Sequence, residues 1–281
     1  MTVGFISVAL LLHFAPTLQH RDDDGFSVYL TIATTVALAG LIQFLTQVIG
    51  WLSERGDRLE FHQFFGTRRS AIGVIPDLVS RHDLDPWYAD GAQAARPKGI
   101  TTVVPFEDLK AATSIAKLFE SYGVQLELRK DSGTYDKGPP RRTFIAVGLG
   151  FNRLTCFLAE RSGDLFQIQY TDAHTGESKD DFLIEHQPHP KPSRDTDYAL
   201  VARVPFHFDG RQVTGFVCAG RLAAGTEAAG YYLKNDWRSM HDRYVKEGKD
   251  LHRHALALVI SHSTNPVFKV PRVVKECFRK V

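Results

Sequence analysis

One stretch of this chain, residues 26–52, limits the possible folds more than any other. Its sequence, FSVYLTIATTVALAGLIQFLTQVIGWL, contains no charged residue. A helix that spans a bilayer needs about 20 mostly apolar residues, and this stretch is long enough. It therefore predicts a membrane-spanning helix. The chain that follows has a mixed polar and apolar composition, and its length suits one sizeable domain of the usual range of about 100–200 residues.

The apolar stretch also carries features that favour contact between helices. Gln43 and Gln47 lie four residues apart and so share one helix face. Ala33 and Ala37 form a pair of small residues that permits close approach of two backbones. These features predict a homo-oligomer that assembles through residues 26–52. The alternative is a tilted anchor whose glutamines lie near the membrane surface.

The charges on either side of the stretch predict its orientation. Four arginines follow it: Arg55, Arg58, Arg68 and Arg69. Residues 19–25, on the other side, carry three aspartates and one arginine. Because Lys and Arg concentrate on the cytoplasmic side of membrane helices, we expect an inner (cytoplasmic) membrane protein whose soluble domain faces the cytoplasm.

A second apolar run, residues 3–18, precedes the first and is shorter. It predicts either a first membrane helix, which would complete a hairpin, or a segment that lies on the membrane surface. A signal peptide is disfavoured, because no positive residue precedes the run and no small-x-small cleavage site follows it. The chain then divides into a transmembrane helical hairpin (1–52), a connector (53–69) and a cytosolic α/β ligand-sensing domain (70–281).

Strand-like and helix-like segments alternate in residues 70–150, which predicts a Rossmann-like open α/β sheet. The expected strands there are 70–78, 100–106, 124–129 and 143–150, with a helix over 107–122. Short strand-like segments at 154–160, 165–171 and 181–186 predict an antiparallel β extension. The remaining expected elements are strands at 199–206, 212–220 and 254–262, and helices at 226–246 and 271–281.

Two glycine-containing turns follow apolar strands, and they are the candidate ligand site. Ligands of open α/β sheets bind beyond the carboxyl ends of the strands, near helix N-termini. Glycines let backbone N–H groups approach an anion, and arginines pair with phosphate or carboxylate groups. The sequence therefore predicts that a nucleotide-like anionic small molecule binds these residues: Gly148, Gly150, Phe151, Asn152, Arg153, Gly220, Arg221, Gly225 and Thr226.

Other chemistries find less support in the sequence. Neither turn is a complete GxGxxG fingerprint, and no P-loop and no G-x-S-x-G elbow occurs. His186 and His189 have metal-ligand spacing, but Pro188 prevents a common helix face. The net charge of +2 is too small for bulk nucleic-acid binding. The three scattered cysteines favour reduced thiols over a disulfide framework. We therefore expect no metal and no cofactor.

The layout of the apolar runs 3–18 and 26–52, followed by an α/β domain with the turns GLGFN and GRLAAGT, resembles the two-transmembrane effectors of bacterial cyclic-oligonucleotide anti-phage systems (CBASS and related pathways). The resemblance lies in architecture alone, and no family site is carried over. It implies an effector that binds a cyclic-oligonucleotide signal and then disrupts the membrane.

Two other functions stay open. A membrane-anchored nucleotide hydrolase needs an acid–base pair in the pocket, for which Asp108 and Glu227 are the candidates. A partner-binding scaffold needs no ligand. Turnover by the cytosolic domain would favour the hydrolase, whereas a stable protein partner without small-molecule binding would favour the scaffold.

Overall fold

The structure is a computed structural model that describes residues 23–76, 104–131, 140–149, 152–169, 181–188, 196–263 and 270–281. The chain forms two compact units, residues 1–60 and residues 61–281. The boundary between them falls within helix α2 (Asp23–Phe65), so the predicted connector 53–69 is divided between the two units.

The first unit contains most of α2, which includes the predicted helix over residues 26–52. Within the described residues, Thr34–Phe65 is the one helical stretch that is long and apolar enough to cross a membrane, with a mean hydropathy of 1.6 and none of its apolar window buried. The hydroxyls of Thr35 and Thr46 donate to carbonyls one turn earlier in the helix, so these polar groups need no water. The predicted first membrane helix, residues 3–18, lies outside the described residues.

The second unit is built on a seven-stranded mixed sheet. Its strands, in spatial order, are β10 (Arg272–Lys280), β9 (His254–Ser263), β7 (Thr196–Phe208), β8 (Arg211–Gly220), β3 (Phe144–Val147), β1 (Ser70–Ile75) and β2 (Gln125–Lys130). Strands β8, β3, β1 and β2 are parallel. Strand β7 is antiparallel to both of its neighbours, and β10 is antiparallel to β9.

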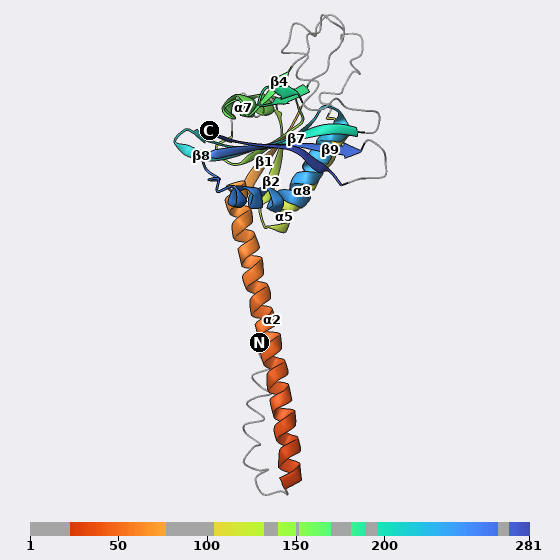
Figure 1. The fold of residues 1–281 in the computed structure, drawn as a ribbon, viewed down its shortest axis with the longest axis vertical. Helices are drawn as coiled ribbons and strands as arrows, with labels where there is room; N and C mark the ends of the chain where they lie inside the picture. Colours follow the sequence, from red (N-terminus) through yellow and green to blue (C-terminus); the bar gives the residue numbers. More distant parts are fainter. Residues whose placement is uncertain are drawn as a thin grey trace, which may run out of the picture. The chain divides into compact units, whose positions relative to one another are not determined.

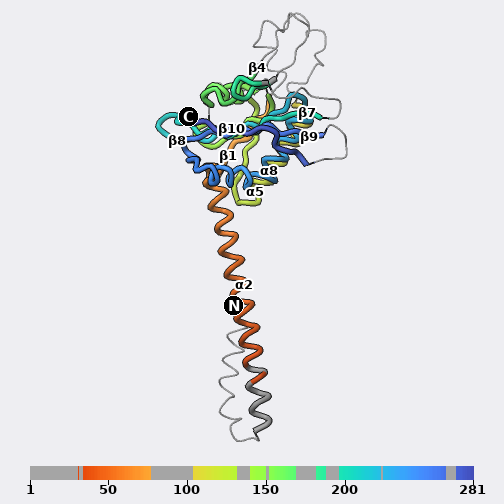
Figure 2. The backbone as a smooth tube through the Cα atoms, viewed as in Figure 1, coloured from red at the N-terminus to blue at the C-terminus, as the bar shows by residue number. Residues whose placement is uncertain are grey.

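Helices cover one face of this sheet, and a helix with a small second sheet covers the other (Figure 1). On the first face lie α5 (Phe106–Ser121) and α8 (Ala223–Lys246). On the second lie α7 (Arg153–Arg161) and an antiparallel sheet of β4 (Phe166–Gln169), β5 (Asp181–Ile184) and β6 (Gln187–Pro188). Figure 2 traces the same path; the chain ends beside the segment before β9, where the Val281 N–H donates to the Arg253 carbonyl. The fold is therefore mixed α/β, with a small antiparallel sheet as expected.

The last turn of α2 belongs to the core of the second unit. Phe61, Phe64 and Phe65 have no exposed surface. Phe61 stacks on Tyr122, with ring centroids 4.1 Å apart, and Phe65 meets the edge of Phe119 at 4.8 Å. These aromatic contacts add to the stabilisation that burial provides, so residues 61–65 are part of the folded unit.

Three sequence-based predictions of secondary structure are wrong. Residues 154–160 belong to helix α7, since Asn152 caps this helix and Leu154 and Leu158 bury one face of it. The tail 271–281 forms strand β10, which pairs along β9. Phe106 begins α5 and does not end a strand, and residues 101–103 lie outside the described residues. The strand that precedes α5 and pairs with β2 is β1, so β1, α5 and β2 form the βαβ unit.

Candidate functional site

The two glycine turns meet at one edge of the sheet, where the parallel strands end; we call it the carboxyl edge. Strands β3 and β8 are parallel neighbours, with Val147 opposite Cys218. The Gly148 N–H donates to the Cys218 carbonyl at 2.9 Å. Gly148 has a φ of +96°, which a residue with a side chain rarely adopts. The first turn therefore leaves β3 beside the end of β8.

The chain leaves these two neighbouring strands toward opposite faces of the sheet. After β3 it continues into α7, whose Leu154 and Leu158 pack in the core on one face. After β8 it continues into α8, whose Ala229 and Leu233 pack in the core on the other. A change of direction between adjacent parallel strands is the position at which open α/β sheets form a crevice.

Asp108, in the first turn of α5, links the two turns. A Cβ atom at Gly148 would lie 3.3 Å from Asp108 Oδ2. On its other side, Asp108 makes a side-chain hydrogen bond with Thr226. The Gly220 N–H donates to Thr226 Oγ1 at 3.1 Å. The hydrogen bond with Thr226 lowers the pKa of Asp108, so the Thr226 hydroxyl donates to the Asp108 carboxylate while its oxygen accepts from Gly220.

The Asp108 carboxyl is costly to ionise in this position. Only 5% of its surface is exposed, and burial raises its pKa to about 6. The neighbouring Glu107 raises the pKa further, while the hydrogen bond from Thr226 opposes both effects. An acid with such a pKa changes charge near neutral pH, which is typical of functional sites.

The turn between β8 and α8 is packed against itself. A Cβ atom at Gly220 would lie 2.3 Å from the Gly225 carbonyl carbon and the Thr226 nitrogen. Thr226 is 2% exposed, and its oxygen and proton are both used within the chain. The two glycines therefore serve close backbone packing, and a ligand reaches this turn only through groups at its outer surface.

Asn152 is likewise engaged within the protein. It is fully buried, its amide donates to the carbonyls of Val74 and Val147, and its Oδ1 accepts from the Leu154 N–H. The Arg153 N–H donates to the Asp131 carboxylate. These contacts hold the ends of β1 and β3 and the start of α7 together. Gly150 and Phe151, also predicted as ligand-binding, lie outside the described residues.

Charged and aromatic side chains lie at the starts of the three helices, and we call them the rim. Lys110 forms an ion pair with Glu227 at 3.1 Å, which joins α5 to α8. The Phe106 ring is 64% exposed and lies 4.7 Å from the Lys110 ammonium. The rim also includes two partly exposed arginines that the sequence predicted, Arg153 and Arg221. The sequence analysis missed Phe106 and Lys110, although Pro105 marks the start of a helix there.

A second buried acidic residue lies at the same edge. Asp197, on β7, is directly opposite His262 on β9, and their side chains approach to 3.5 Å. Asp197 has no exposed surface, and a Cβ atom at Gly225 would lie 3.2 Å from its Oδ2. The sequence analysis singles out neither Asp197 nor His262. Nothing in the local pattern indicates their burial, which results from pairing of the strands.

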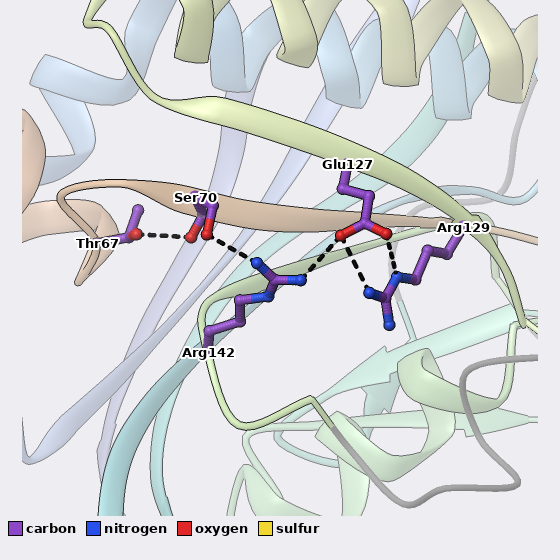
Figure 3. Close-up of polar contacts among 5 residues, drawn as sticks. All are labelled: Thr67, Ser70, Glu127, Arg129 and Arg142. Atoms are coloured by element: carbon purple, nitrogen blue, oxygen red, sulfur yellow. Dashed lines mark hydrogen bonds and ion pairs between the residues drawn. The ribbon is translucent and has the colours of Figure 1, made fainter.

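A different kind of cluster runs along β1 and β2 (Figure 3). Arg142 donates to Ser70 Oγ and to Glu127, both at 2.8 Å, and Arg129 makes two further hydrogen bonds to Glu127. The bond from Arg129 lowers the pKa of Glu127. These side chains are largely exposed to water, so this cluster links β1 and β2 to the residues before β3 and contributes little stability.

No group of three or more His, Cys, Asp or Glu side chains within the described residues is arranged to hold a metal ion. Of the predicted histidine pair, His186 lies in a turn, whereas His189 lies outside the described residues. Burial raises the pKa of the Cys218 thiol far above its ordinary range, so this thiol stays protonated.

Comparison with known proteins gives no further indication of what the site does: no family model, no curated protein and no solved structure matches this chain.

Proposed function

We propose that this protein is a membrane-anchored effector whose soluble unit binds a nucleotide-like signal at the carboxyl edge. The observation that carries the proposal is the change of direction between β3 and β8, which send their following helices to opposite faces of the sheet. Ligands of open α/β sheets bind at such a point. In this proposal β8, β3, β1 and β2 form the Rossmann-like part of the sheet.

The rim supplies the groups that would recognise a nucleotide. Arg153 and Arg221 bind phosphate oxygens, for which a guanidinium has matching geometry. The exposed ring of Phe106 offers a stacking surface to a base. The interior of the glycine turn makes no ligand contact in this arrangement, because its atoms contact each other.

The apolar helix would place this sensor at a bilayer. Side chains such as Leu41 and Ile49 are 53% and 65% exposed, which suits lipid contact. The face of Gln43 and Gln47 would hydrogen-bond to the same helix of another copy, so that the chain assembles as a homo-oligomer. Residues 3–18 complete a hairpin in this proposal, and the soluble unit faces the cytoplasm.

A ligand acts on such an assembly only if it binds one packing state more tightly than another. We propose that the nucleotide signal favours a packing of the membrane helices that disrupts the bilayer, as part of anti-phage defence. Replacement of Gln43 and Gln47 by leucine would then leave nucleotide binding intact and abolish ligand-dependent leakage from vesicles that contain the protein.

The test of binding uses the full chain in detergent and a panel of mono-, di- and cyclic nucleotides, including cyclic oligonucleotides. Thermal shift and calorimetric titration should identify at least one that binds. Arg153→Ala and Arg221→Ala should each weaken its binding about ten-fold or more. Arg211→Ala is the matched control, since Arg211 is exposed at the start of β8, the end away from the carboxyl edge. Absence of binding, or equal affinity in all variants, would contradict the proposal.

A second candidate is a membrane-anchored nucleotide hydrolase, which the raised pKa of Asp108 favours. A carboxyl with a pKa of about 6 can act as a general acid or base near neutral pH. Turnover of any bound nucleotide by the full chain, and its loss in Asp108→Asn, would identify an enzyme. Binding without turnover would favour the sensor over the hydrolase.

A further inference from the structure

The pair of Asp197 and His262 leaves three buried polar atoms without hydrogen-bond partners. These atoms are Oδ1 and Oδ2 of Asp197 and Nε2 of His262. The other ring nitrogen of His262, Nδ1, lies 3.3 Å from the Ser263 carbonyl oxygen. Asp197 has no exposed surface, and the side chain of His262 is 7% exposed. A buried carboxylate without donors is unfavourable, and in native proteins such groups have a partner or a function.

The Asp197–His262 pair lies at the carboxyl edge, beside the first turn of α8. Asp108 contacts Thr226, and Asp197 lies against Gly225, so two buried carboxyl groups adjoin successive residues in the first turn of α8. This helix is long, and its N-terminus carries a partial positive charge. Asp197 therefore lies near the positive end of this helix, with His262 Nε2 3.5 Å from its Oδ2 and no hydrogen bond to either oxygen.

The chemistry of the three atoms restricts what they would bind. A carboxylate repels phosphate, so Asp197 does not bind the anionic part of a ligand. A transition-metal site needs more protein ligands than the described residues supply here. A pair of hydroxyls provides two donors for the carboxylate and an oxygen that accepts from, or donates to, the imidazole.

We infer that Asp197 and His262 recognise the ribose hydroxyls of the nucleotide signal. This inference rests on the proposed function and adds the sugar to it: the rim holds phosphate, and Asp197 distinguishes ribonucleotides from deoxyribonucleotides. Because Asp197 is fully buried, binding includes an opening of the edge beside α8. A site built to bind hydroxyls rejects an analogue without them, because its buried polar groups are then left unpaired.

The test compares the ribo and 2′-deoxy forms of the tightest-binding nucleotide of the panel, with the full chain in detergent. The unmodified chain should prefer the ribo form about ten-fold or more. Asp197→Asn should reduce this ratio to about one, and His262→Ala should lower it. The control is Asp209→Asn, because Asp209 follows the opposite end of β7 and pairs with Arg141. This variant should keep the same ratio of ribo to 2′-deoxy affinity as the unmodified chain.

The other possible results distinguish failure of the inference from failure of the proposed function. Binding without preference for the ribo form, measured on the unmodified chain, overturns the inference and leaves the proposed function standing. If Asp197→Asn keeps the preference for the ribo form and only lowers the melting temperature, then Asp197 and His262 have a structural role. This result also overturns the inference. Failure of every nucleotide to bind removes the proposed function and the inference together.

Discussion

The Arg203 guanidinium donates through Nε to the carbonyl oxygen of Phe64, at 2.8 Å, in the last turn of helix α2. Arg203 is 1% exposed and also donates to the Leu251 carbonyl at 2.6 Å. It lies over the rings of Phe64 and Tyr244. A cation at the C-terminal end of a helix interacts favourably with the helix dipole. Arg203 therefore joins the end of α2 to the sheet and to the segment before β9.

Arg203→Met should lower the free energy of unfolding of the second unit by about 3 kcal/mol, because the buried carbonyl of Phe64 and the part-buried carbonyl of Leu251 lose their donor. The check is chemical denaturation of the detergent-solubilised chain, followed by tryptophan fluorescence. Arg211→Met is the control, since Arg211 is exposed at the start of β8. Equal midpoints for the two variants would show that Arg203 contributes nothing specific.

A soluble fragment of this protein should need the last turn of α2. Residues 57–281 should fold, whereas residues 66–281 should not, because the shorter fragment lacks three fully buried phenylalanines. Loss of one such side chain costs about 3–5 kcal/mol, and the whole stability of a domain is about 5–15 kcal/mol. Circular dichroism and thermal melting of the two fragments test this. A cooperative melt of 66–281 would show that these residues are dispensable.

The stability of the protein should depend on pH through Asp108. Its pKa rises from an ordinary value of 3.8 in the unfolded chain to about 6 in the folded one, mainly through burial. The folded state therefore holds the proton more tightly, so stability falls as the pH rises from about 4 to about 6 and changes no further above that. Asp108→Asn removes this loss, which amounts to about 3 kcal/mol at most.

The measurement for Asp108 is the difference in free energy of unfolding between the unmodified chain and Asp108→Asn at pH 4 and at pH 7. The variant should gain in relative stability at pH 7. Asp242→Asn, at an exposed position on α8, controls for a general effect of charge removal. A difference that is the same at both pH values would rule out burial of an ionisable Asp108.

The contact of Gly220 with Gly225 should make the turn after β8 intolerant of any side chain. Gly220→Ala places a methyl group 2.3 Å from the backbone of Gly225 and Thr226, and should cost about 3 kcal/mol. Gly56→Ala is the matched control: no atom lies within 4 Å of its added methyl group, and alanine favours a helix by about 1 kcal/mol. A melting temperature for Gly220→Ala equal to that of the unmodified chain would contradict the observed packing.

Much of the second unit could be predicted because its elements carry strong local signals. The expected strand 254–262 corresponds to His254–Ser263, and the expected helix 226–246 begins one turn earlier, at Ala223. The strands 199–206 and 212–220 flank a turn at Asp209 and Gly210, both with positive φ. Apolar runs separated by Asp-Gly are a reliable signal for two paired strands.

The errors arose where the local pattern was ambiguous. Residues 154–160 contain β-forming residues, but Asn152 as a helix cap and the spacing of Leu154 and Leu158 were available signals for a helix. The tail has basic residues at helical spacing, yet its Val273 and Val274 favour the strand that pairs with β9. Lysines and arginines are also common on edge strands such as β10.

The site was harder to predict than the fold. That two glycine turns share one edge follows from the parallel strands before them, which the sequence indicates. Three predicted ligand residues instead make contacts inside the protein: Gly220, Thr226 and Asn152. These contacts depend on distances of a few ångströms between elements, which the sequence does not indicate. Pairing between β7 and β9 buries Asp197, and no short stretch of sequence encodes that pairing.

The most direct test of the central claim is photo-crosslinking of the full chain with 8-azido-ATP and with an azido cyclic oligonucleotide, followed by mass spectrometry of tryptic peptides. If the carboxyl edge is the ligand site, the label should be found in peptide 99–110, which carries Phe106, or in peptides 143–153 and 222–234, and should be competed by the unmodified nucleotide. Label confined to other peptides, or label that no nucleotide displaces, would contradict the account.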